Sequence, residues 1–185
     1  MRREITLAAF AIIATANGCK DNRWVPRGRA EIVLSEMKLS GAGAVSRRID
    51  TDEAFAQSVL DGIASGDSVW LDVAAQLKPT SAAAEASLDI ALASALPRAP
   101  RRVLSLVGDE YEPEAVCGMP FLRADSSQVI SYYQQAMQAL GSVRDSALTG
   151  IADVCRTALD SSRSRRLERI NPTYIIKNKP GAARR

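Results

Sequence analysis

Apolar side chains recur at helical spacing along most of the chain between Asp50 and Leu159. Within each segment they fall three or four positions apart, which places them on one face of a helix. Prolines, glycines and capping residues separate the segments. The pattern predicts six helices, over residues 50–65, 67–78, 80–96, 100–107, 126–140 and 145–159.

Short connections join these helices in three consecutive pairs, and such connections place neighbouring helices antiparallel. The chain has 185 residues, enough for one domain with a real core. Aromatic residues make up only 5 % of it, which favours closely packed helices over a β-sandwich. We predict an all-α fold, a compact bundle of about six helices in antiparallel pairs. A short helical-repeat stack is the alternative.

The first residues have the pattern of a secretory signal. Two arginines follow Met1, an apolar run extends from Ile5 to Ala16, and polar residues begin at Asn17. Cleavage after Ala16 is one expectation. The other is cleavage before Cys19, because residues 16–19 resemble the lipobox of bacterial lipoproteins, which implies lipidation of Cys19 and a place at the outer membrane. A buried helix in a cytosolic protein is the alternative.

Three cysteines are present, at positions 19, 117 and 155. If Cys19 carries lipid, Cys117 and Cys155 remain as an even pair that an oxidising compartment would join. Two unrelated buried thiols are the alternative. The domain boundaries expected from these features are a signal at 1–18, a flexible tether at 19–50, a helical domain at 51–160 and a basic, disordered tail at 161–185.

Histidine is absent from the chain, which excludes every mechanism or metal site that needs an imidazole. No phosphate-binding glycine motif or zinc-ligand spacing is present, and we expect no cofactor and no metal. A hydrolase could use a pair of carboxylates in a cleft. The candidates are Asp67, Asp72, Glu85 and Asp89, although helix capping and solvation account for them equally well.

Several aromatic and apolar residues are candidates for binding a partner. Trp70 lies on an apolar helix face and is expected in the core. Of the adjacent pair Tyr132 and Tyr133 only one can face inward, and we expect Tyr132 to face outward. The loop over residues 109–125 carries Tyr111, Met119 and Phe121, which either form a partner site or pack the loop against the domain.

Charge is segregated along the chain. Residues 161–185 carry a net charge of +7, which leaves −4 for the rest of a chain whose overall charge is +3. Such a tail can bind nucleic acid, anionic lipid or an acidic protein surface, or it can be a solvated end. Its basic residues are Arg163, Arg165, Arg166, Arg169, Lys177, Lys179, Arg184 and Arg185.

A resemblance covers residues 66–159. The segments "GDSVWLDVAAQLKPTSAAAEASLDIALASALPRAPRRVL" and "VCGMPF", with a later helical cysteine, resemble small exported bacterial helical proteins of uncharacterised function. The resemblance implies a helical fold with two cysteines and implies no activity.

These observations favour a non-catalytic binding, inhibitory or accessory protein of the bacterial envelope, exported to the periplasm. Its expected partner is an envelope protein or an anionic envelope component, with attachment to the membrane through the lipid on Cys19. The first alternative is an envelope hydrolase that uses paired carboxylates. The second is a cytosolic protein that binds nucleic acid through its basic tail, although in an exported protein nucleic acid is not the expected partner.

Overall fold

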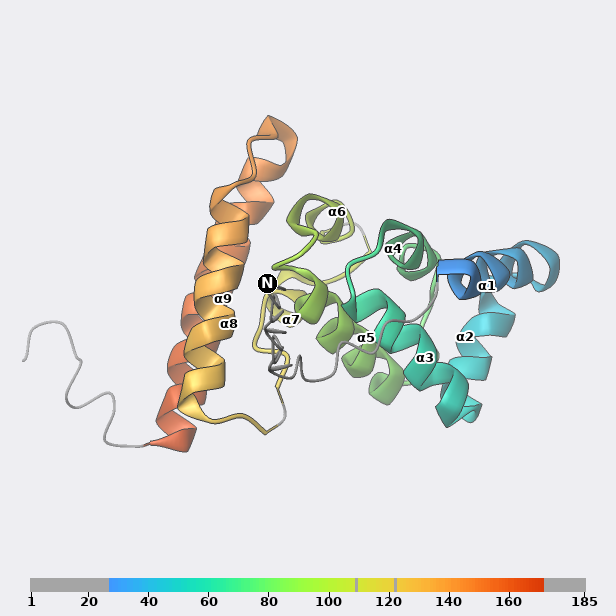
Figure 1. Cartoon of the computed structure of the whole chain (residues 1–185), viewed down its shortest axis with the longest axis horizontal. Helices are drawn as coiled ribbons and strands as arrows, with labels where there is room; N and C mark the ends of the chain where they lie inside the picture. The colour runs from blue at the N-terminus through green and yellow to red at the C-terminus, as the bar shows by residue number, and fades with distance from the viewer. Residues whose placement is uncertain (1–26, 109, 122, 172–185) are drawn as a thin grey trace, which may run out of the picture.

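The helices of the protein lie side by side in a row, from α1 and α2 at one end to α8 and α9 at the other (Figure 1). The structure is a computed structural model, and it describes residues 27–108, 110–121 and 123–171. Within these residues the chain is all-α, as predicted. The helices are α1 (Arg27–Ser40), α2 (Ala42–Thr51), α3 (Glu53–Ala64), α4 (Ser68–Ala74), α5 (Ala82–Ala95), α6 (Pro100–Leu104), α7 (Pro113–Val116), α8 (Ser126–Gly141) and α9 (Ser146–Ile170).

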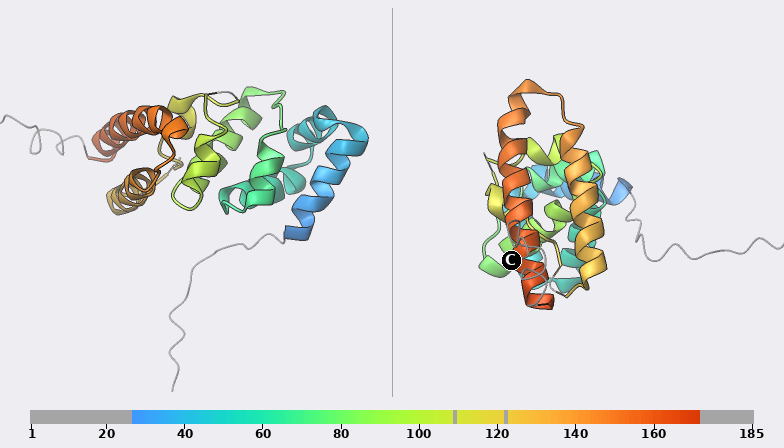
Figure 2. Two further views of the ribbon diagram at one scale, coloured as in Figure 1. Left: turned by 90° about the horizontal axis from the view of Figure 1, so that it is seen from above. Right: turned by 90° about the vertical axis from the view of Figure 1, so that its left-hand side faces the viewer.

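Contacts between helices follow two lines through the molecule. In one line α1 contacts α4, α4 contacts α6 and α6 contacts α9. In the other α2 contacts α3, α3 contacts α5, α5 contacts α7 and α7 contacts α9. The last helix hairpin, α8 with α9, therefore joins the rest through α6 and α7 at one end of the row (Figure 2).

The prediction of a flexible tether is wrong for residues 27–50. This segment forms α1 and α2, whose inner faces bury Ala30, Val33, Met37 and Val45. Gly41 makes the turn between the two helices with a φ of 82°, in the left-handed region that glycine adopts freely. Burial of these side chains outweighs the weak helix propensity of a glycine-containing sequence, since propensity is only a weak prior.

The expected tail also begins too early, because α9 continues to Ile170 and buries Leu167. Residues 172–185 lie outside the described residues, as does Cys19. The expected loop at 109–125 contains the short helix α7, and together with α1 and α2 this gives nine helices within the described residues rather than six. The helix predicted over residues 50–65 begins at Glu53, because Asp52 accepts a hydrogen bond from the backbone N–H of Phe55 and caps α3.

Trp70 lies at the centre of the core, as expected, and is fully buried. Its ring lies against the backbone of Gly62 on α3. A Cβ atom built on Gly62 would fall 2.3 Å from Cδ2 of the ring, closer than any real carbon contact. α3 and α4 can therefore approach this closely only with glycine at position 62.

We predict that Gly62→Ala lowers the free energy of unfolding by about 1–3 kcal/mol, because the added methyl group overpacks the core against Trp70. Urea denaturation measures the change. The matched control is Gly150→Ala in α9, where a Cβ atom meets nothing within 4 Å. That helix-interior substitution is expected to raise stability by roughly 0.5–1 kcal/mol. Equal stability of Gly62→Ala and the unaltered protein would contradict the close packing described here.

Candidate functional site

A cleft of about 560 Å³ runs between the C-terminal end of α5 and the outer face of α8. Two prolines and two aromatic residues supply its apolar surface, and serines, glutamines and one arginine supply its polar surface. Its lining residues are Ser94, Pro97, Arg98, Pro120, Phe121, Ser127, Gln128, Ser131, Tyr132 and Gln135. The cleft thus brings together two of the predicted partner-binding residues, Phe121 and Tyr132.

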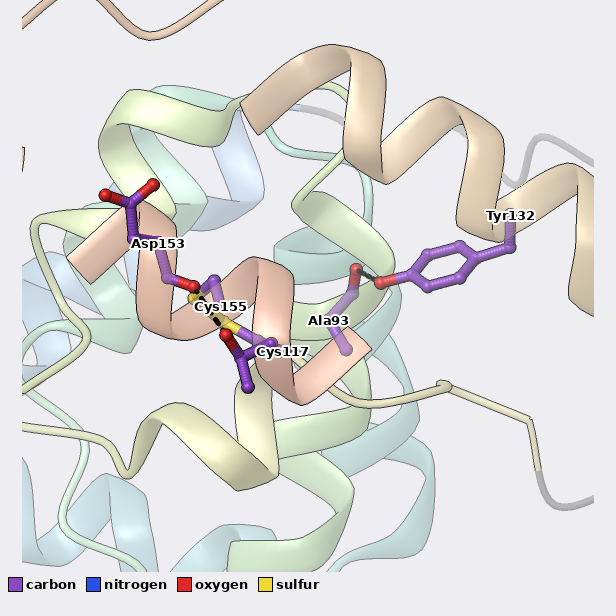
Figure 3. Close-up of a disulfide and its surroundings, with 6 residues drawn as sticks. Ala93, Cys117, Tyr132, Asp153 and Cys155 are labelled. Atoms are coloured by element: carbon purple, nitrogen blue, oxygen red, sulfur yellow. Dashed lines mark hydrogen bonds between the residues drawn. A yellow bond between two sulfur atoms is a disulfide. The ribbon is translucent and has the colours of Figure 1, made fainter. Parts of the chain in front are cut away.

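Phe121 and Tyr132 form an edge-to-face aromatic pair on one side of the cleft. Their ring centroids are 5.5 Å apart and the ring planes meet at 83°, a favoured aromatic geometry. Tyr132 extends from α8 towards α5, where its hydroxyl donates a 2.7 Å hydrogen bond to the carbonyl oxygen of Ala93 (Figure 3). Burial raises the pKa of the Tyr132 hydroxyl above its ordinary value, so this donor keeps its proton.

The prediction that Tyr132 faces outward is wrong. Its side chain is only 7 % exposed, whereas its neighbour Tyr133 lies on the surface of the α8–α9 hairpin and is half-buried. The Tyr133 hydroxyl donates to Asp160, and the Arg163 guanidinium lies 4.1 Å from its ring centroid. Tyr132 faces inward, where its hydroxyl reaches the Ala93 carbonyl oxygen on α5. Tyr133 faces α9, where its hydroxyl reaches Asp160.

The segment that carries Phe121 is held from the side of α9. The Cys117 and Cys155 sulfur atoms lie at disulfide distance, with Cα atoms 5.0 Å apart, and both residues are fully buried (Figure 3). A bond across a sequence separation of 38 residues contributes about 4 kcal/mol in the chain-entropy model. The backbone N–H of Met119 adds a 3.0 Å hydrogen bond to the Ser162 hydroxyl. Met119 itself packs against the core, so it supports the loop and does not line the cleft.

The first turn of α8 is built by a capping box. The Asp125 carboxylate accepts from the backbone N–H of Gln128, and the Gln128 side-chain oxygen accepts from the backbone N–H of Asp125. Further along the same face, the Gln135 side-chain amide donates a 3.0 Å hydrogen bond to the Ser131 hydroxyl. This wall of the cleft is therefore ordered, polar and uncharged.

The sequence reasoning missed Arg98 and the polar face of α8. Gln128, Ser131 and Gln135 recur at helical spacing, between the buried positions Val129, Tyr132 and Ala136. That stripe is visible in the sequence, but a neutral polar stripe is typical of any solvated helix face. The stripe forms one wall of a cleft because the end of α5 lies opposite it, and the sequence alone does not show that position.

The other predicted partner-binding residues lie elsewhere. The Tyr111 hydroxyl donates to the Ala74 carbonyl oxygen, with an O···O distance of 2.7 Å, and burial raises its pKa. Arg165 is exposed and lines a separate pocket of about 310 Å³ beside α7, while Arg166 is half-buried and Arg169 is exposed. All three lie near the C-terminal end of α9, and Arg169 is in its last turn, where the negative end of the helix dipole favours a positive charge.

The four candidate carboxylates separate into two groups. Asp67 caps α4 by accepting from the Val69 backbone N–H, and Asp72 forms an ion pair with Arg102. Glu85 and Asp89 line a pocket of about 250 Å³ together with Tyr111, Glu110 and Glu112. Burial, together with the nearby negative charge of Glu85, raises the pKa of Asp89 above its ordinary value of 3.8.

No group of acidic residues or cysteines in the described ranges has the arrangement needed to hold a metal ion. In the same ranges no helix is long and apolar enough to cross a membrane. Comparisons with protein-family models, with curated proteins and with solved structures found no match for this chain.

We predict that Asp89→Asn raises the free energy of unfolding at neutral pH. The raised pKa means that the folded protein favours the neutral carboxyl over the charged carboxylate. The neutral carboxyl therefore contributes its full stabilisation below about pH 3.8, and this contribution is lost as pH rises through the folded-state pKa. Asparagine keeps the neutral form at every pH, so its advantage over aspartate grows with pH. Urea denaturation at a series of pH values measures it.

Asp125→Asn is the contrasting control. Hydrogen bonds from Ser127 and from the Gln128 backbone lower the pKa of the Asp125 carboxyl. Its stabilisation is therefore present above the unfolded-state pKa and lost on acidification, so this variant is less stable than the unaltered protein at neutral pH. Parallel pH profiles for Asp89→Asn and the unaltered protein would refute the assignment of Asp89.

Proposed function

We propose that this chain is a non-catalytic, exported binding protein of the bacterial envelope, acting as an inhibitory or accessory partner of another protein. The observation that supports the proposal best is the cleft between α5 and α8. It combines an apolar surface with a neutral polar wall, the composition common to sites that bind a ligand without transforming it. Among the described residues that line it there is no carboxylate or cysteine, and no histidine or lysine that could activate its serines as nucleophiles.

Export is proposed from the N-terminal pattern and from the paired cysteines. A buried disulfide suits an oxidising compartment such as the periplasm, and it is rare in the bacterial cytosol. The proposal adds lipidation of Cys19 and attachment to the outer membrane. The body of the molecule would then be a compact bundle with its helices paired antiparallel.

An envelope hydrolase is the second candidate, because Glu85 and Asp89 line one pocket and the Asp89 carboxyl has a raised pKa, as general acids do. Release of reducing ends from purified peptidoglycan by the unaltered protein would favour this candidate over the binding proposal. The nucleic-acid alternative has less support, since Arg163 already lies over the Tyr133 ring and 3.6 Å from Asp160.

We predict that the protein made from the full gene in a bacterial host is cleaved before Cys19 and acylated, and that its mass rises by two hydrogen atoms, about 2 Da, when the reductant converts the disulfide to two thiols. Intact mass spectrometry with and without reductant measures both events. The substitution Cys19→Ser is the control, because it removes the acyl chains and leaves the disulfide. An unprocessed chain with three free thiols would refute export and make nucleic acid the leading candidate partner.

We predict that an envelope protein co-purifies with this chain and is lost when the cleft is filled. Ser131→Arg places a long side chain on the exposed wall of α8 and should lower capture at least tenfold. Ser35→Arg adds the same side chain to an exposed position on α1 at the other end of the row, and should leave capture unchanged. Quantitative mass spectrometry of cross-linked eluates compares the two. Capture that survives Ser131→Arg would contradict a partner site in this cleft.

A further inference from the structure

We propose that the cleft recognises an acidic segment of the partner protein, in which an aspartate or glutamate side chain pairs with Arg98 and an adjacent apolar residue covers the apolar surface. This inference rests on the proposed binding function and adds the chemistry of the partner.

Among the described residues that line the cleft, Arg98 is the only one that carries a charge. Two nearby arginines are paired with carboxylates, Arg101 with Asp145 and Arg102 with Asp72. Arg98 has no such partner among the described residues. An exposed guanidinium beside an apolar surface, with no internal counter-ion, is complementary to a carboxylate supplied from outside.

The guanidinium of Arg98 is also held in position before any partner binds. Its Nη1 donates to the carbonyl oxygens of Ala64, at 3.1 Å, and of Ser94, at 3.3 Å. These carbonyls belong to the last turns of α3 and α5, where the negative ends of two helix dipoles attract the cation. The Nη2 and Nε donors have no partner within the described residues, so they remain for a carboxylate. Holding the side chain in place lowers the entropy that binding would lose.

The opposite wall presents both donors and acceptors. The Gln128 side-chain oxygen is occupied by the Asp125 backbone N–H, which leaves the Gln128 amide N–H groups for a ligand. The Ser131 oxygen accepts from Gln135, which leaves its own O–H to donate. The Ser127 O–H donates to the Asp125 carboxylate and the Gln135 amide donates to Ser131, so the side-chain oxygens of Ser127 and Gln135 remain as acceptors. A wall with both donors and acceptors suits the peptide N–H and C=O groups that flank an acidic side chain.

A protein segment accounts for the apolar surface better than a free anion or a sugar does. A small anion would leave Pro97, Pro120 and Phe121 uncovered in a cleft of about 560 Å³. A sugar ring would need an open aromatic face, but Tyr132 is only 7 % exposed and Phe121 meets it edge to face. An acidic residue beside an apolar residue matches both parts of the surface.

The test is a titration of the ¹⁵N-labelled, oxidised full chain, followed by NMR, with two blocked peptides, acetyl-Ala-Glu-Leu-Ala-amide and its glutamine counterpart. We expect the glutamate peptide to shift backbone amides around Ser94, Phe121 and Ser131, and to bind at least tenfold more tightly than the glutamine peptide. Arg98→Gln should remove this difference. Arg101→Gln, which breaks a pair outside the cleft, should preserve it.

Equal binding of the two peptides would overturn the inference without any variant, so the test does not depend on Arg98→Gln remaining folded. Shifts confined to other surfaces would overturn it as well. Chitotriose is the sugar probe, and stronger cleft shifts with it than with the glutamate peptide would replace the acidic segment by a glycan.

The same variants separate this inference from the proposed function. If the peptides fail while Ser131→Arg still abolishes capture of the envelope partner, the cleft binds a partner of different chemistry and only the inference is wrong. If capture survives Ser131→Arg, the proposed function itself is wrong.

Discussion

The link between Cys117 and Cys155 is the constraint on which the cleft depends. The α8–α9 hairpin joins the other helices only through α6 and α7 among its main contacts, and α7 has a single turn. A loop and one helical turn would lose considerable chain entropy on becoming ordered. The covalent link between the end of α7 and the middle of α9 places the Phe121 segment, and with it the distance between the two walls. The Tyr132 hydroxyl, bonded to Ala93, holds the same distance from the side of α8.

The core and the cleft differ in the kinds of side chain that form them. Around Trp70 the helices approach so closely that Gly62 has no room for a methyl group, and the contacts are apolar. The cleft combines an apolar surface of prolines and aromatic rings with neutral polar side chains, and among its described lining residues only Arg98 carries charge. The tightest packing therefore lies between α3 and α4, whereas the cleft places exposed polar side chains of α8 beside Tyr132 and Phe121, which also belong to the core or pack against it.

Much of the fold follows from the sequence because caps and apolar stripes agree with each other between Asp52 and Leu104 and again in α8 and α9. The helices α1 and α2 could not be predicted from the sequence, because the glycines at 41 and 43 are typical of a linker. The segment is helical because the fold buries Val33 and Val45. For the site, Phe121 could be identified as an apolar residue in a long loop. Arg98 could not, since an unpaired arginine is recognised only when the positions of all nearby carboxylates are known.

The outer face of α8 has a consequence for how this protein diversifies. Ser131 and Gln135 are exposed and lie outside the helix caps, and substitutions at such positions usually change stability by only about 0.5 kcal/mol. Natural variation can therefore accumulate on one wall of the cleft while the helices beneath it are preserved by selection for folding. Under the proposed binding role, such substitutions would change which partner binds while the scaffold stays the same. In such a lineage, sequence divergence concentrated on this face of α8 would record the history of its partners.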